Sequence, residues 1–170
     1  YLGDTAVAVN PKDPRAGALV GKSVRLPLVG RVIPIIADDY VVLPEALATS
    51  DEERNDPKAK MATGFLKVTP AHDQNDYELG QRHKDAIEAA GNPVLINIFA
   101  PDATISDKHG WSDVNDARPF VGKKREEARK LVVEEFKRLG LFEGSKPHRH
   151  SVKHSDRSKA IVEPYLSDQW

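Results

Sequence analysis

The sequence contains no cysteine, so disulfide bonds and thiolate metal sites are excluded. It also lacks any apolar run near the roughly 20 residues that a membrane-spanning helix needs. The first residues have neither the basic nor the apolar region of a signal peptide. From these absences we expect a cytoplasmic protein that does not enter a membrane.

No excess of charge of one sign is present either. Lysine and arginine number 25 and aspartate and glutamate 26, which gives a formal net charge of −1. This balance argues against a strong, nonspecific RNA binder, although it permits a local basic face, and we expect no DNA partner. The 170 residues, of which 39% are hydrophobic and 30% charged, are typical of one globular domain spanning 1–170.

The most informative stretch is 62–83, with the sequence ATGFLKVTPAHDQNDYELGQRH. Its first part, Phe65–Thr69, alternates apolar and polar side chains and predicts a strand. Pro70 has no amide hydrogen for a ladder, so the strand should end there. Asp73 is a good N-cap and predicts that a helix begins directly after it.

This strand-turn-helix unit gathers four side chains with chemistry: Lys67, Thr69, Asp73 and Asp76. A cation, a hydroxyl and two carboxylates at one end of the unit suit the binding of a small zwitterion. The alternative needs no ligand, because Asp73 is then a plain N-cap and Asp76 complements the helix dipole. His72 is a single histidine beside a turn, for which a structural role is the simpler interpretation.

The remaining patterns predict strands at 5–9, 23–28, 31–36 and 94–99, a helical turn at 16–20, and helices at 85–90 and 122–139. The apolar stripe of the last helix is expected to face the core. We interpret 43–60 as a mobile, acidic surface insertion and 106–117 as a loop. His148, His150 and His154 suggest zinc, but no thiolate or nearby carboxylate completes a site, so we expect no metal.

Four segments together resemble the editing domain of the valyl-tRNA synthetases, an insertion in the catalytic domain of these class I aminoacyl-tRNA synthetases. They are LGDTAVAVNPKDPR at 2–15, IPIIAD at 33–38, the stretch 62–83, and VEPYLSDQW at 162–170. The resemblance covers nearly the whole chain. It implies a mainly β fold with a β-barrel core and peripheral helices, whereas the patterns alone support only a mixed, β-rich domain.

The resemblance also concerns the neighbourhood of the chain. It implies that 160–170 is a tail leading back to the catalytic domain, which is then a partner within the same polypeptide. In the family, a threonine-rich peptide ending in Arg-Pro-Glu-Thr precedes the position of Tyr1 and helps to build the pocket, so the activity of these 170 residues alone is left open. Some relatives carry a cysteine pair at the spacing of Ser155 and Ser158, which this chain lacks.

The activity implied is hydrolysis of the ester that joins a wrong threonine to the 3′ end of valine tRNA. Threonine and valine are nearly isosteric, which is the known reason for a second, hydrolytic site in this enzyme. Asp76 matches the family position that holds the substrate ammonium, and Asp73 the one suited to the threonine hydroxyl. Lys67 and Thr69 match positions needed for hydrolysis by a directly attacking water.

Three further residues are predicted to bind substrate: Met61, Phe65 and His72. Met61 stands where relatives often place an aromatic side chain that stacks on adenine. No cofactor is expected in this domain, since ATP and Mg²⁺ belong to the catalytic domain of the parent enzyme. Twelve basic and six acidic side chains between 122 and 159 either face tRNA phosphates or form a solvated surface with i,i+4 pairs.

Two alternatives stay open. One is the editing domain of a related isoleucine or leucine synthetase, against which the segment 67–73, KVTPAHD, favours valine. The other is a noncatalytic module that docks tRNA.

Overall fold

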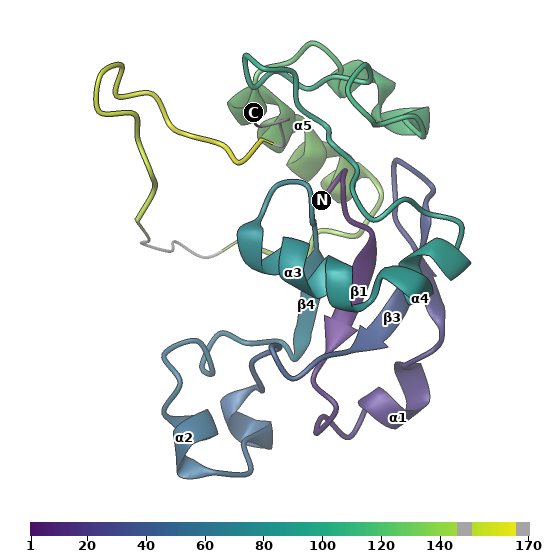
Figure 1. The fold of residues 1–170 in the computed structure, drawn as a ribbon, viewed down its shortest axis with the longest axis vertical. Coiled ribbons are helices and arrows are strands. Elements are labelled where there is room, and N and C mark those ends of the chain that lie inside the picture. The colour runs from purple at the N-terminus through teal and green to yellow at the C-terminus, as the bar shows by residue number, and fades with distance from the viewer. Residues whose placement is uncertain (146–150, 166–170) are drawn as a thin grey trace.

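The computed structural model describes residues 1–145 and 151–165 (Figure 1). Its strands are β1 (Ala6–Val9), β2 (Ser23–Arg25), β3 (Val32–Ala37) and β4 (Phe65–Val68). Its α-helices are α1 (Ala16–Leu19), α2 (Asp51–Arg54), α3 (Gln74–Arg82), α4 (Lys84–Ala89) and α5 (Arg125–Arg138), and its 3-10 helices are η1 (Glu45–Leu47) and η2 (Asn115–Phe120).

The strands form one mixed sheet in the order β2-β3-β1-β4. β1 pairs with β3 in parallel, and the other two pairs are antiparallel. Of the described residues, 29% are helical and 14% lie in strands or isolated bridges, so the fold is a mixed sheet with helices. Among the described residues the sheet is open, with β2 and β4 at its edges, so the barrel core implied by the resemblance is not confirmed.

Helices α3 and α4 cross one face of this sheet (Figure 1). Leu79 and Ile87 are fully buried and anchor the two helices to the sheet. The cluster around them contains Ala6, Ala8, Ile36, Val41, Val68 and Val94. Burying one such large side chain contributes about 1.5–3 kcal/mol, so this contact holds α3 firmly against β4.

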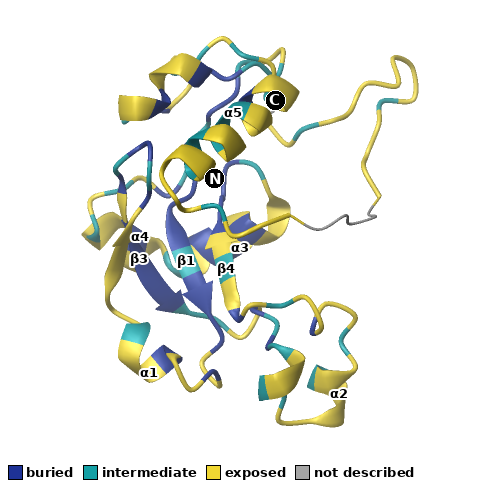
Figure 2. Cartoon of the chain, turned by 180° about the vertical axis from the view of Figure 1, so that it is seen from behind, coloured by how far each residue is buried: buried dark blue, intermediate teal, exposed yellow. Residues whose placement is uncertain are grey.

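A second apolar cluster surrounds Trp111, which is 1% exposed, and extends to α5. Buried residues run from the sheet to the inner side of α5, while the outer side of this helix is exposed (Figure 2). Ala128 is buried, and Leu131 and Val132 pack against the cluster. The predicted helix is therefore confirmed, and its stripe faces the core at these three residues, whereas Leu139 at the end of the stripe is 42% exposed. Gly140, with a φ of 70°, follows the end of the helix.

The prediction of a strand at 94–99 is wrong, because this segment forms only an isolated bridge between Phe99 and Ile105. Side chains take the main-chain hydrogen bonds that a neighbouring strand would need. The amide of Ile98 donates to Nε2 of His72 at 3.1 Å. The side chain of Asn97 bonds both the amide and the carbonyl of Phe99, at 3.0 and 3.1 Å. The apolar pattern reflects burial rather than sheet pairing.

The segment 43–60, interpreted from the sequence as a mobile, acidic surface insertion, contains η1 and α2. Ser50 and Glu53 form a capping box that fixes the start of α2. Glu53 also pairs with Lys12 at 2.5 Å, which ties this segment to the turn after β1. Similarly, the loop predicted at 106–117 gives way to η2 at its end. Within the described parts of the chain, no helix is long and apolar enough to cross a membrane.

Candidate functional site

The predicted strand-turn-helix unit is present, and it places Lys67, Thr69 and Asp76 side by side. Lys67 lies in β4, Thr69 directly after it, and Asp76 in the first turn of α3. Nζ of Lys67 donates to Oγ1 of Thr69 at 2.7 Å and lies 3.7 Å from Oδ2 of Asp76. The amide of Thr69 donates to the same Oδ2 at 2.9 Å. The three residues form one hydrogen-bonded group.

Asp76 is 5% exposed, which is unusual for a carboxylate. Its burial raises the pKa of the carboxyl above the ordinary value, while the Thr69 amide and the Lys67 ammonium act in the opposite direction. An ionised carboxylate in this position is therefore poorly compensated by the protein. It is well suited to accept a further positive charge.

Asp73 is the N-cap of α3, as predicted. Its Oδ1 accepts hydrogen bonds from the amides of Asn75 and Asp76, at 2.9 and 3.0 Å. Among the described residues, Oδ2 of Asp73 and Oδ1 of Asp76 have no hydrogen-bond partner. Each carboxylate thus uses one oxygen for the fold and leaves the other for a ligand, so capping and binding are compatible.

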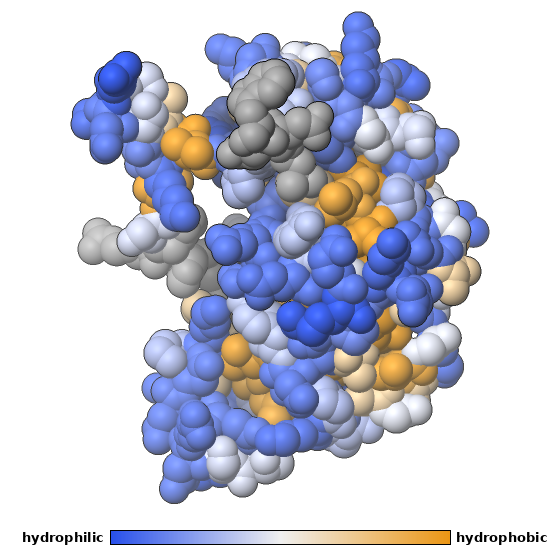
Figure 3. Space-filling view, viewed as in Figure 1, coloured by the Kyte–Doolittle hydropathy of each residue, from blue (hydrophilic) through white to orange (hydrophobic). Residues whose placement is uncertain are grey.

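A cavity of about 560 Å³ brings together five of the predicted residues. They are Met61, Phe65, Lys67, Asp73 and Asp76. Other walls come from Tyr40, Lys58 and Asn75. The cavity opens between the segment 43–60 and the unit of β4 and α3, on a side where hydrophobic and hydrophilic surface adjoin (Figure 3). Met61 is 62% exposed and offers apolar surface at this opening.

The guanidinium of Arg15 stacks on the ring of Phe65 and holds this side chain at the cavity. The guanidinium carbon lies 4.4 Å from the centre of the Phe65 ring. Asp13, which is buried, fixes Arg15 through two hydrogen bonds of 2.9 and 2.6 Å. Gly64 permits this packing, because its φ is 82° and a Cβ there would lie 2.5 Å from the guanidinium. The orientation of Phe65 therefore depends on residues far away in the sequence.

Thr69 and His72 line a second cavity, also about 560 Å³, whose walls include Lys67 and Asp73. Nε2 of His72 accepts from the amide of Ile98, so the proton of the neutral ring lies on Nδ1, which is 3.3 Å from the carbonyl of Pro164. Burial lowers the pKa of His72. Both ring nitrogens contact main chain, as a structural role requires.

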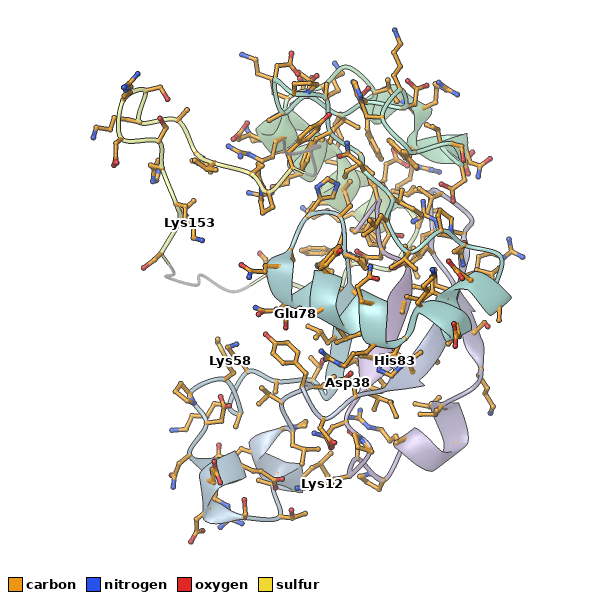
Figure 4. The ribbon with its side chains drawn as sticks, viewed as in Figure 1. Lys12, Asp38, Lys58, Glu78, His83 and Lys153 are labelled. Atoms are coloured by element: carbon orange, nitrogen blue, oxygen red, sulfur yellow. The ribbon has the colours of Figure 1, made fainter. Side chains whose placement is uncertain are left out.

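Two residues near the site were not predicted from the sequence. Asp4 is 2% exposed, and its Oδ1 lies 2.5 Å from Oγ1 of Thr69. The sequence signal for Asp4 was a charged residue two positions before the apolar strand β1. Tyr40 reaches the cavity because the loop after β3 is fixed by Asp38, whose carboxylate accepts from the Tyr40 amide and contacts His83 at 2.8 Å (Figure 4).

The predicted absence of a metal concerns three histidines. His148 and His150 lie outside the described residues, and Nδ1 of His154 is 2.9 Å from the carbonyl of Val152. In the described part of the chain, no group of three or more His, Cys, Asp or Glu side chains is arranged to hold a metal ion.

Known proteins were compared with the chain as a whole. No protein-family model matches it. It is 43% identical over 169 residues to a valine–tRNA ligase of Bacillus cereus, 44% identical over 168 residues to one of Listeria innocua, and 45% identical over 169 residues to one of Protochlamydia amoebophila. Each match covers 99% of this chain, which spans only 16%, 15% and 14% of the respective relatives. The resemblance predicted from the motifs is confirmed: the chain is homologous to a segment of valine–tRNA ligase.

Proposed function

We propose that this chain is a post-transfer editing domain of valyl-tRNA synthetase, which hydrolyses the ester of threonine on mischarged valine tRNA. One observation carries the proposal. The hydrogen-bonded group of Lys67, Thr69 and Asp76 borders a cavity that Asp73 also lines. Its charges match an aminoacyl ester, which has an ammonium, a polarised carbonyl and, in threonine, a hydroxyl.

In this proposal, each carboxylate uses its unoccupied oxygen. Oδ1 of Asp76 accepts from the α-ammonium, which supplies the positive charge that the buried carboxylate lacks. Oδ2 of Asp73 accepts from the threonine hydroxyl, which valine does not have. Met61 and Phe65 give apolar contact to the terminal adenine at the opening of the cavity. His72 does not line this cavity; it supports the turn between β4 and α3, and any contact that it makes with the substrate comes from the second cavity, which it shares with Lys67 and Asp73.

Hydrolysis needs an attacking water and stabilisation of the oxyanion that forms. Lys67 supplies a positive charge close to the ester carbonyl, and Thr69 fixes the position of that charge. Water adds to the carbonyl carbon, the bond to the ribose oxygen breaks, and the proton of the water goes to that oxygen. The products are free threonine and uncharged tRNA. No cofactor takes part in this domain, and ATP and Mg²⁺ serve the catalytic domain.

The partners follow from the same proposal. They are the 3′ end of valine tRNA and the catalytic domain of the same polypeptide, reached through the tail 160–170, and the reaction takes place in the cytoplasm. We treat 1–170 as one domain, with 43–60 as a surface insertion that forms one side of the cavity. The valine–tRNA ligase relatives favour valine over isoleucine or leucine as the cognate amino acid.

The experiment is single-turnover deacylation by the full-length protein. Threonyl-tRNA and valyl-tRNA, both prepared on valine tRNA, are compared with threonyl-tRNA alone in buffer. The proposal expects rapid loss of threonine and little loss of valine. Equal hydrolysis of both would contradict threonine selectivity. Binding of the tRNA without any acceleration of hydrolysis would instead identify a noncatalytic docking module.

A further inference from the structure

Asp4 is a buried carboxylate that neither cavity includes among its wall residues. It lies two residues before β1, which pairs with β4 so that Ala6 is opposite Val68. This pairing brings Asp4 to the end of β4, where its Oδ1 is 2.5 Å from Oγ1 of Thr69. The contact joins residues 65 positions apart in the sequence.

Asp4, Thr69 and Lys67 form a hydrogen-bonded row, and the chemistry of the three groups fixes the direction of its hydrogen bonds. A lysine ammonium only donates, and an ionised carboxylate only accepts. The Thr69 hydroxyl has a single proton and lies between both groups, 2.7 Å from Nζ of Lys67 and 2.5 Å from Asp4. It must therefore accept from Lys67 and give its own proton to Asp4. Without Asp4, no acceptor in this row fixes that proton.

The position of Asp4 is itself strongly constrained. The amide of Thr5 donates to the carbonyl of Val68 at 2.9 Å, which holds the main chain beside the end of β4. Nη1 of Arg31 donates to the carbonyl of Asp4 at 2.7 Å. Arg31 is buried and paired with Asp113 at 2.5 Å. These bonds fix the main chain at Asp4, and its side chain is buried, so its carboxylate is well placed to orient the hydroxyl that it binds.

We propose that Asp4 is a positioning residue for the editing reaction proposed above. It orients the Thr69 hydroxyl so that this group holds the Lys67 ammonium beside Asp76. The inference rests on that proposed function for its catalytic consequence, but the hydrogen-bonded row is a property of the chain in any case. Asp4 acts through Thr69 and does not touch the substrate.

Four variants of the full-length protein separate orientation from stability. Asp4→Ala removes the acceptor, whereas Asp4→Asn keeps a carbonyl oxygen in the same place. Thr69→Val removes the hydroxyl on which Asp4 acts. Thr5→Val is the matched control, because Thr5 is the buried neighbour of Asp4 and its hydroxyl, among the described residues, bonds only the carbonyl of Val94, at 3.3 Å.

For threonyl-tRNA deacylation, Asp4→Ala should lower kcat about 100-fold and leave KM nearly unchanged, since a misplaced charge affects the transition state most. Asp4→Asn should lower kcat only about fivefold, because a neutral acceptor makes a weaker hydrogen bond than a carboxylate. Thr5→Val should keep wild-type kcat. A loss in Asp4→Ala that Thr5→Val matches, or that Asp4→Asn does not rescue, would overturn the inference.

A second measurement does not depend on catalysis. The rate at which an amine-reactive ester labels Lys67 is measured by mass spectrometry. Asp4→Ala and Thr69→Val should change this rate equally, the double variant should show no further change, and Thr5→Val should leave it as in wild type. Additive effects would overturn the inference. If wild type fails to hydrolyse threonyl-tRNA while the labelling pattern holds, the proposed function falls and the row through Asp4 stands.

Discussion

The main-chain amide of Thr69 donates to Oδ2 of Asp76 at 2.9 Å, so the residue after β4 fixes a carboxylate in the first turn of α3. This bond explains why both residues lie at one place although seven positions separate them. It leaves the opposite oxygen of Asp76 for a ligand. Consequences for binding, stability and pH dependence follow from this arrangement.

The first prediction concerns the charge of Asp76. Asp76→Asn keeps an oxygen that accepts from the Thr69 amide but cannot balance an ammonium. Threonyl-tRNA deacylation should fall by a factor of about 30 or more, the equivalent of at least about 2 kcal/mol for a lost buried charge pair. Valine activation, measured by pyrophosphate exchange in the same full-length variant, should be unchanged.

The same variant should not lose stability, although it loses deacylation activity. Burial raises the pKa of Asp76 above its ordinary value of 3.8, so its stabilising contribution is complete below that pH and is lost as the pH rises. At pH 7 the ionised group therefore costs stability. Denaturant unfolding of Asp76→Asn at pH 7 should give a free energy at least equal to wild type. A clearly lower value would contradict this account of its burial.

The second prediction separates the two uses of Asp73. Asparagine is as good an N-cap as aspartate, whereas alanine costs about 1 kcal/mol of stability. Asp73→Asn should therefore unfold like wild type, yet clear threonine more slowly because an amide oxygen is a weaker acceptor for the hydroxyl. The loss should be larger for threonine than for 2-aminobutyrate, which lacks a hydroxyl.

Ser50→Ala is the control for Asp73. It removes another N-cap, that of α2, and Ser50 is not among the wall residues of the cavity. It should lower stability by about 1 kcal/mol without changing the ratio of the two clearance rates. Equal losses on threonine and 2-aminobutyrate in Asp73→Asn would leave Asp73 as a helix cap only.

The third prediction is a pH effect at His72. Burial lowers its pKa below the ordinary 6.5, and protonation of Nε2 would place a donor against the Ile98 amide. A group with a depressed pKa in the folded state contributes stability that is complete above its unfolded pKa and lost as the pH falls. Stability should therefore decrease as the pH falls below 6.5. In His72→Gln this part of the decrease should be absent from unfolding curves between pH 7 and 5.

The fourth prediction concerns Arg31, which lies directly before β3 and joins the residues before β1 to Asp113. Its guanidinium makes two bonds to Asp113, at 2.7 and 2.5 Å, and two to the carbonyls of Leu2 and Asp4. Arg31→Met should cost about 3–5 kcal/mol, since it leaves buried acceptors without a donor. Lys84→Met, which breaks an exposed pair with Glu88, should cost less than about 0.5 kcal/mol in the same unfolding assay.

How much the sequence predicts depends on how local the signal is. The alternation before Pro70 and the N-cap at Asp73 lie within a few residues of what they specify, and β4 and α3 form as predicted. Lys67, Thr69 and Asp76 could be placed together for the same reason. Asp4 could not, because its contact with Thr69 depends on the antiparallel pairing of β1 with β4.

The incorrect prediction of a strand at 94–99 has the same origin, namely contacts that the sequence pattern does not show. A run of apolar residues reports burial but not which groups take the main-chain hydrogen bonds. His72 and Asn97 take them here, and neither contact is visible in the sequence. Similarly, Tyr40 lines the cavity because Asp38 fixes the turn after β3. Asp38 is held in turn by Arg82 and His83, which belong to a pair of helices that begins more than 30 residues later in the sequence.

The most direct test of the central claim is the single-turnover rate of threonyl-tRNA deacylation by wild type, Lys67→Met and Lys84→Met in the full-length protein. The two lysines form ion pairs of the same 3.7 Å length, one with Asp76 at the cavity and one with Glu88 on the surface. We predict a loss of about 100-fold or more for Lys67→Met and a wild-type rate for Lys84→Met. Rapid hydrolysis by Lys67→Met, equal to that of the other two proteins, would contradict the assignment of this site.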